Sequence, residues 1–236
     1  MIKGIVFDLD NTLEEFTEHE EVVEQEMASL LQQRYGIDPV RFVRIFDMIK
    51  TGYLHSRSLP QDYGRDVWFK ETLAHFDVFD ADIASLVDMY WDLLLSKVQL
   101  YQGVPELLAD LKRSFRLGIL SDSDGDRYWK EKRIKQLHIG SFFDAIVTSD
   151  DVGANKPHPR GFIEVCKQLG VLTSQAVMVG DHPEVDHVMA KELGMVTVWV
   201  TEGLSEQQKQ RSYEYVDYVV DKVSEVGELV EKIAQE

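Results

Sequence analysis

Two aspartates stand two positions apart, directly after a short apolar run near the start of the chain. The run is Gly4-Ile5-Val6-Phe7, and Asp8 and Asp10 follow it with Leu9 between them. A carboxylate can attack phosphorus and form an aspartyl phosphate. A second carboxylate at this spacing can protonate the departing oxygen and then activate the water that hydrolyses the intermediate. The pair therefore predicts covalent catalysis, with Asp8 as nucleophile and Asp10 as acid and base.

Polar groups of matching chemistry follow three further apolar runs. Ser121 and Asp122 follow the second run, Lys156 lies in the loop after the third, and Asp181 and Asp186 follow the fourth. Clustered carboxylates repel and raise one another's pKa unless a positive charge compensates them. Mg²⁺ supplies such compensation, because it takes one or two carboxylates together with water and phosphate oxygens. We therefore expect Mg²⁺ as cofactor, with Ser121 and Lys156 holding a transferring phosphoryl group.

Taken singly, each of these signals has a more ordinary explanation. An Asp-x-Asp pair at a strand end is most often turn or capping chemistry. Gly180-Asp181 before Pro183 fits a simple helix N-cap, and Lys156-Pro157 alone is a loop. Their joint occurrence after four successive apolar runs is what favours a catalytic site.

Short apolar strands must position these residues. We expect strands at 4–7, 117–120, 145–147, 176–179, 196–200 and 218–220. Runs that are apolar on both faces are typical of strands in a parallel sheet covered on both sides. Helical patterns separate them at 104–111, 162–169 and 183–193. This alternation predicts an α/β fold with a doubly wound, mainly parallel sheet, in which ligands bind beyond the carboxyl ends of the strands.

Residues 14–98 interrupt the alternation. They contain no convincing strand, and helical patterns lie at about 17–31, 40–50, 63–76 and 81–97. A connection this long is rarely structureless. We therefore expect an all-helical cap domain at 14–98, inserted after strand one, while residues 1–13 and 99–236 form the α/β core.

Three local patterns, two in this insertion and one after it, predict a helix start, core residues and a helix face. Thr17 and Glu20 have capping-box spacing, which would open the first helix. Trp68 and Phe69 are expected to fill the core of the cap. The segment 127–135 holds five basic residues in nine, and a solvated helix face is the favoured interpretation, with an anion-binding or partner-binding surface as the alternative.

Composition and charge exclude several classes of protein. The chain has 236 residues, with 25 Lys and Arg against 42 Asp and Glu, and a net charge of −17. Such acidity argues against nucleic acid and against an anionic membrane surface as partners. Cys166 is the single cysteine and has the spacing of a buried helical residue, so neither a disulfide nor a catalytic thiol is expected. With no apolar run long enough for a membrane span and no signal-peptide core, we expect a cytoplasmic monomer or homodimer.

Together these motifs resemble those of the haloacid dehalogenase (HAD) superfamily, in the branch with a helical cap after the first strand (the C1, subfamily I branch). The four matching motifs are residues 5–13, 119–122, 156–159, and 179–181 with Asp186. As a set they are highly specific. The resemblance covers 1–13 and about 100–200, whereas 14–98 agrees only in length, helicity and position.

The resemblance implies a role for each matching position. Asp8 would be the nucleophile and Asp10 the acid and base. Mg²⁺ would be bound by Asp8, the backbone carbonyl of Asp10, and Asp181. Asp186 would orient the loop that carries Asp181 or the side chain of Lys156. The groups implied at the phosphoryl group are Thr12, Asn11, Ser121, the backbone of Asp122, and Lys156. Asp122 stands where the family more often has Asn, so its charge is tolerable beside a phosphate only if the carboxylate points away.

Asp10 also bears on the expected reaction. In this superfamily, dehalogenases usually carry another residue at that position and phosphonate hydrolases lack the acid, whereas phosphatases and phosphomutases keep it. We therefore expect a Mg²⁺-dependent phosphomonoester hydrolase that acts on a small phosphorylated metabolite, with a phosphomutase or another HAD-type hydrolase as the alternative. A non-enzymatic phospho-acceptor domain and a relative without catalysis are disfavoured, because Asp8 lies on the first strand and the set of acids with Lys156 is complete.

Overall fold

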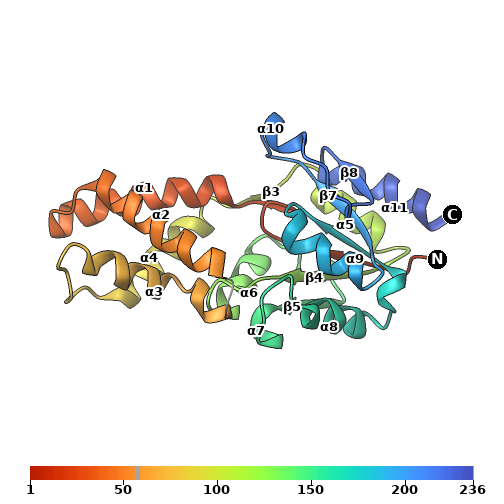
Figure 1. Ribbon diagram of the computed structural model, residues 1–236, viewed down its shortest axis with the longest axis horizontal. Helices are drawn as coiled ribbons and strands as arrows, with labels where there is room; N and C mark the ends of the chain where they lie inside the picture. Colours follow the sequence, from red (N-terminus) through yellow and green to blue (C-terminus); the bar gives the residue numbers. More distant parts are fainter. Residues whose placement is uncertain (57–58, 236) are drawn as a thin grey trace. The chain divides into compact units, whose positions relative to one another are not determined.

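The described residues, 1–56 and 59–235, form two units in this computed structural model (Figure 1). The α/β unit comprises Met1–Glu15, Gln99–Asp122 and Leu137–Glu236. The helical unit comprises Phe16–Val98 and Ser123–Gln136. Residues 123–136 are expected from the sequence in the α/β core, whereas in the structure they group with the helices of the insertion.

A six-stranded parallel sheet forms the centre of the α/β unit, in the order β5-β4-β1-β6-β7-β8. Its strands are β1 (Gly4–Phe7), β4 (Arg116–Ser121), β5 (Ala145–Thr148), β6 (Ala176–Gly180), β7 (Val196–Val200) and β8 (Tyr218–Val220). Each coincides with an apolar run predicted as a strand. The predicted doubly wound, mainly parallel sheet is therefore confirmed. In the observed register Phe7 lies opposite Ile119 on one side and Val179 on the other, so the carboxyl ends of β1, β4 and β6 meet.

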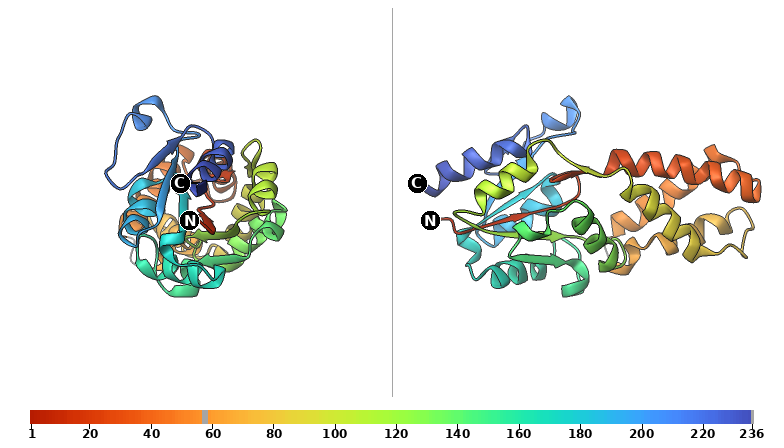
Figure 2. Two further views of the ribbon diagram at one scale, coloured as in Figure 1. Left: turned by 90° about the vertical axis from the view of Figure 1, so that its right-hand side faces the viewer. Right: turned by 180° about the vertical axis from the view of Figure 1, so that it is seen from behind.

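Helices cover both faces of this sheet, as Figure 2 shows. On one face α8 (Pro159–Leu169) and α9 (Val188–Glu192) bury side chains such as Phe162 and Ala190 against Val6 and Met178 of the strands. On the other face α5 (Val104–Leu111) packs with α11 (Val226–Gln235). The remaining short helices are α7 (Ser149–Val152), α10 (Glu206–Lys209), η2 (Gly140–Phe142), η3 (Thr173–Gln175), the π-type turn η4 (Pro183–His187) and η5 (Val223–Glu225). Cover on both faces explains why the strands lack a polar side.

Two short strands, β2 (Glu14–Glu15) and β3 (Gln99–Leu100), pair antiparallel within the α/β unit. They lie where the chain leaves this unit and returns to it. The chain leaves a second time after Asp122 and returns at Leu137. A strand of two residues carries no periodicity, which is why the sequence does not predict this pair.

The helical unit is built around aromatic side chains. Its helices are α1 (Thr17–Tyr35), α2 (Pro39–Ser56), η1 (Pro60–Tyr63), α3 (Arg65–Ala74), α4 (Ile83–Leu95) and α6 (Arg127–Gln136). Phe69 packs 5.1 Å from Phe46 and 5.9 Å from Tyr90, measured between ring centroids. Trp68 and Phe69 are both buried, so the prediction that they fill this core is confirmed. Such aromatic pairs stabilise a small core beyond the area that they bury.

The start of α1 differs from the predicted capping box. The helix begins at Thr17 itself, with Phe16 as the N-cap residue. The carboxylate of Glu20 accepts hydrogen bonds from Arg65 at 2.5 Å and from the hydroxyl of Tyr90 at 2.8 Å. Glu20 therefore binds side chains in the interior of the helical unit, and the capping-box prediction is wrong.

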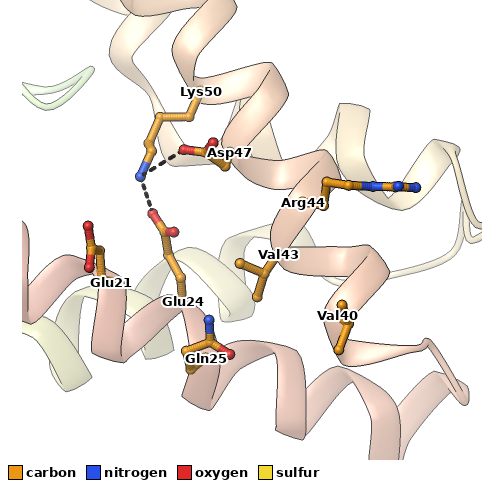
Figure 3. A pocket seen from close by; sticks show the side chains of 8 residues that line it. All are labelled: Glu21, Glu24, Gln25, Val40, Val43, Arg44, Asp47 and Lys50. Atoms are coloured by element: carbon orange, nitrogen blue, oxygen red, sulfur yellow. Dashed lines mark hydrogen bonds and ion pairs between the residues drawn. The ribbon is translucent and has the colours of Figure 1, made fainter.

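A cavity of about 440 Å³ lies between α1 and α2 (Figure 3). Lys50 places its ammonium 2.5 Å from Glu24 and 3.9 Å from Asp47, and the three side chains face one another across the cavity wall. Burial raises the pKa of Glu24 to about 7, although Lys50 opposes that rise. Lys50 thus pairs with two of the acidic residues that line the cavity, and no predicted site residue lines it.

The basic helix α6 is solvated only in part: Lys135 is exposed, whereas two of the five basic residues are buried. Lys130 and Arg133 are fully buried, and their side-chain nitrogens lie 3.3 and 3.4 Å from Oδ2 of Asp124. Arg65 of α3 approaches Oδ1 of the same carboxylate at 3.9 Å. The solvated-face prediction is therefore wrong for Lys130 and Arg133, because charge patterning cannot show a counter-ion that only the fold brings into contact.

Two exclusions drawn from composition can be compared with the structure. Cys166 is buried in α8, and burial raises the pKa of its thiol to about 11, which makes it a poor nucleophile. Among the helices described, none combines the length and the apolar character needed to cross a membrane.

Removing the carboxylate of Asp124 tests the buried charge cluster. We expect Asp124→Ala to lower the free energy of unfolding by about 3–5 kcal/mol, because three buried cations lose their shared counter-ion. Asp92→Ala is the matched control, since the exposed Asp92 pairs with Lys132 at the surface, an arrangement worth at most about 1 kcal/mol. Urea denaturation followed by circular dichroism measures both changes. Equal losses in the two variants would contradict the buried-cluster account.

Candidate active site

A buried lysine joins two carboxylates beyond the carboxyl ends of the strands. Nζ of Lys156 lies 2.6 Å from Oδ1 of Asp8 and 2.7 Å from Oδ1 of Asp186. Asp8 directly follows β1, Asp186 lies in η4 after β6, and Lys156 belongs to the loop between α7 and α8. All three residues are buried. The topology thus brings together three residues that are widely separated in the sequence.

Asp181 adds a third carboxylate to this group. Oxygen atoms of Asp8, Asp181 and Asp186 lie within 4.8 Å of one another. Burial raises the pKa of Asp8 to about 7, against the charge of Lys156, and the charges of Asp186 and Asp10 raise it further. Burial and the neighbouring charge of Asp8 also raise the pKa of Asp181 well above its ordinary value. The single positive charge of Lys156 does not balance the negative charges of these carboxylates. Their oxygen atoms are ligands of the kind that a hard divalent cation prefers.

The loop after β1 carries the remaining residues of the first motif. Asn11 has a φ of 55°, which turns the chain sharply after Asp10. The charge of Asp10 raises the pKa of both Asp8 and Asp181, so Asp10 lies within electrostatic reach of both. Thr12 is fully buried, and its hydroxyl donates to Oδ1 of Asp181 at 3.5 Å. Thr12, expected at a phosphoryl group, therefore contacts the predicted metal ligand in this structure.

The carboxylate of Asp122 points toward a backbone amide. Its Oδ1 accepts the N–H of Lys156 at 2.8 Å, which ties the end of β4 to the loop that carries the lysine. Ser121, the last residue of β4, is buried, and its hydroxyl donates to the Asp122 carbonyl at 3.4 Å. The side chain of Asp122 thus has a positioning contact that the sequence did not suggest.

Asp186 bridges two loops of the site. Its Oδ1 accepts from Lys156, while its Oδ2 accepts the backbone N–H of His182 at 3.1 Å. Gly180 permits this approach, because a Cβ at that position would lie 2.4 Å from Oδ2 of Asp186. Asp186 therefore contacts both the lysine and the loop that follows Asp181.

Trp199 is a residue of this site that the sequence reasoning missed. It lies near the end of β7, opposite Gly180 in the register, and its indole N–H donates to the backbone carbonyl of Asp181 at 2.9 Å. In the sequence it appears only as one large apolar residue of a predicted strand. The available signal was its place at a strand end, next to the strand that leads into Asp181.

The region that carries these residues matches a known family and several known proteins. A model described as haloacid dehalogenase-like hydrolase matches residues 5–200. The chain is 30% identical to a glyceraldehyde 3-phosphate phosphatase from Methanocaldococcus jannaschii, over 100% of both chains. It is 28% identical to an N-acylneuraminate-9-phosphatase from Rattus norvegicus, over 98% of this chain and 95% of that protein. The crystal structure of a HAD phosphatase from Thermococcus onnurineus is similar with a TM-score of 0.72 and 27% identity, covering 97% of this chain and 98% of that one.

The raised pKa of Asp8 predicts that the site destabilises the metal-free protein at neutral pH. The pKa is about 7 in the folded protein and about 3.9 in an unfolded chain. Between these values the folded state binds more protons, so stability falls as pH rises toward 7 and stays low above it. We therefore expect Asp8→Asn to raise the melting temperature in EDTA at pH 8 by at least about 2–4 °C, the shift for about 1 kcal/mol.

Differential scanning fluorimetry at pH 8 and pH 5 measures this effect. The gain in melting temperature should shrink at pH 5, where the buried Asp8 is already protonated. Asp110→Asn at an exposed position is the control and should change neither value. A gain of the same size at both pH values would show that the charge of Asp8 is not its cause.

Proposed function

The chain belongs to the haloacid dehalogenase-like hydrolases, and from that premise we propose that it is a Mg²⁺-dependent phosphatase. Its substrate is a small phosphorylated metabolite, and the reaction passes through an aspartyl phosphate on Asp8. The observation that carries this proposal is the buried group in which Lys156 contacts Asp8 and Asp186 while Asp181 lies within 4.8 Å of both carboxylates.

The first half of the reaction transfers the phosphoryl group to Asp8. A carboxylate oxygen of Asp8 attacks phosphorus, the bond from phosphorus to the ester oxygen breaks, and Asp10 donates its proton to the departing alcohol. Although burial lowers the pKa of Lys156, the charges of Asp186 and Asp8 raise it well above its ordinary value, so the ammonium stays charged. That fixed positive charge supports the negative charge of the transferring group.

The second half releases phosphate. Asp10, now ionised, takes a proton from water, and the water oxygen attacks the phosphorus of the aspartyl phosphate. The bond between phosphorus and the Asp8 oxygen breaks, which restores the Asp8 carboxylate and yields inorganic phosphate. This step requires a second carboxyl group close to the nucleophile. The charge of Asp10 raises the pKa of Asp8, which supports Asp10 as that group.

The residues proposed to hold Mg²⁺ are the carboxylates of Asp8 and Asp181 and the backbone carbonyl of Asp10. When bound, the ion supplies positive charge that stabilises the phosphoryl oxygens and relieves the repulsion among the acids. Ser121, Asn11, Thr12 and the backbone of Asp122 are proposed to contact the phosphoryl group. Asp186 holds Lys156 and the Asp181 loop in place.

The named relatives support the substrate class. One is a phosphatase of glyceraldehyde 3-phosphate and another of an N-acylneuraminate 9-phosphate, so we propose these two compounds as the first substrates to test. We further propose that residues 14–98 are the cap domain of this family. The acidic charge of the chain argues against a nucleic-acid or anionic membrane partner. We propose that the enzyme is cytoplasmic and acts as a monomer or homodimer.

Phosphate release from a panel of phosphomonoesters tests the proposal. Asp8→Asn is expected to lower kcat/KM by at least about 1,000-fold, because the nucleophile is lost. EDTA should abolish activity and added Mg²⁺ should restore it. Asp110→Asn is the control and should retain activity, since Asp110 is exposed on α5. Phosphate release that survives both Asp8→Asn and excess EDTA would overturn the proposal.

A further inference from the structure

The peptide unit between Asp181 and His182 is hydrogen-bonded at both of its polar groups. Its carbonyl oxygen accepts the indole N–H of Trp199 at 2.9 Å. Its N–H donates to Oδ2 of Asp186 at 3.1 Å. Rotating this peptide plane would break both bonds and take these partners from polar groups of the buried Trp199 and Asp186, which is costly. The backbone at Asp181, and with it the direction in which the side chain leaves the chain, is therefore fixed from two sides.

We propose that Trp199 is a positioning residue for the metal site, acting through the backbone of Asp181. This inference rests on the proposed function, because it assigns Trp199 a task at the proposed Mg²⁺ site. The indole N–H holds the Asp181 carbonyl so that the Asp181 carboxylate stays close to Asp8. Trp199 does not touch the reacting atoms.

Such a restraint is needed because the acids of the cluster repel one another. Oxygen atoms of Asp8, Asp181 and Asp186 lie within 4.8 Å, and burial strengthens their repulsion. The side chain of Asp181 is held only loosely by the hydroxyl of Thr12, at 3.5 Å. The firmer restraint is on its backbone, and residues that orient ligands in this way raise metal affinity.

The surroundings of Trp199 keep its donor in one place. The side chain is buried, and it leaves β7 beside Gly180 of β6. Tyr213 packs edge-on against the ring, with centroids 5.5 Å apart and planes at 84°. Indole has a single donor and no acceptor, so the N–H of this buried ring is used on the Asp181 carbonyl. A phenyl ring could fill much of the same space but would offer no hydrogen bond.

Binding of Mn²⁺, followed by the electron paramagnetic resonance signal of the free ion, tests this assignment without reference to activity. Trp199→Phe is expected to weaken Mn²⁺ binding by about tenfold, the low end of the effect of a residue that orients a ligand. With saturating Mg²⁺ the variant should recover most of kcat, and its KM for the phosphate ester should not change. Tyr213→Leu is the matched control, because it removes packing against the same ring but keeps the N–H, and its affinity should equal that of the wild type.

A second replacement separates the hydrogen bond from ring size. Benzothienyl-alanine at position 199 keeps the shape of the indole and replaces the N–H with sulfur, so it guards against a Phe variant that does not fold. It should weaken Mn²⁺ binding as much as Trp199→Phe does. Wild-type affinity in this isostere, or equal weakening in Tyr213→Leu, would overturn the assignment.

These outcomes are distinct from a failure of the proposed function. A wild-type protein that neither binds Mn²⁺ nor releases phosphate would overturn the proposed function, and the role of Trp199 with it. A wild-type protein that does both, with affinity unchanged by the isostere, would overturn only the role of Trp199.

Discussion

The site depends on one buried ammonium group, that of Lys156, placed between the carboxylates of Asp8 and Asp186. A buried ammonium with no carboxylate beside it would cost several kcal/mol, so Lys156 requires an acidic partner in this group. The contact can form only if the loops after β1, β5 and β6 meet at one edge of the sheet. The strand order β5-β4-β1-β6 meets that condition, because it sets β1 between the strands that lead to the other loops.

The cluster of Asp8, Asp181, Asp186 and Lys156 contains more carboxylates than positive charges. Burial raises the pKa of Asp8 and of Asp181, which means that ionising these two carboxyl groups costs the folded protein stability. Hydrogen bonds from Thr12 and Trp199 restrain Asp181 at its side chain and its backbone. A fold that spends stability to keep acids together is typical of a site that is completed by a cation and a phosphorylated substrate.

Much of this arrangement was predictable from the sequence, and the exceptions share a cause. The strands and the group around Asp8 were predictable because apolar runs end in polar residues and parallel strands align those ends. The burial of Lys130 and Arg133 was not, since their counter-ion Asp124 reaches them only through the fold. Trp199 was missed for the same reason, because only the fold brings its indole N–H to the carbonyl of Asp181.

The proposed reaction requires Asp8 to carry the phosphoryl group during turnover. Borohydride reduces an aspartyl phosphate to homoserine, so quenching the enzyme with borohydride during turnover of a phosphomonoester, followed by peptide mass spectrometry, reads the site directly. We expect homoserine at position 8 when substrate and Mg²⁺ are both present. An unmodified Asp8 in an enzyme that is turning over, or modification at another aspartate, would contradict it.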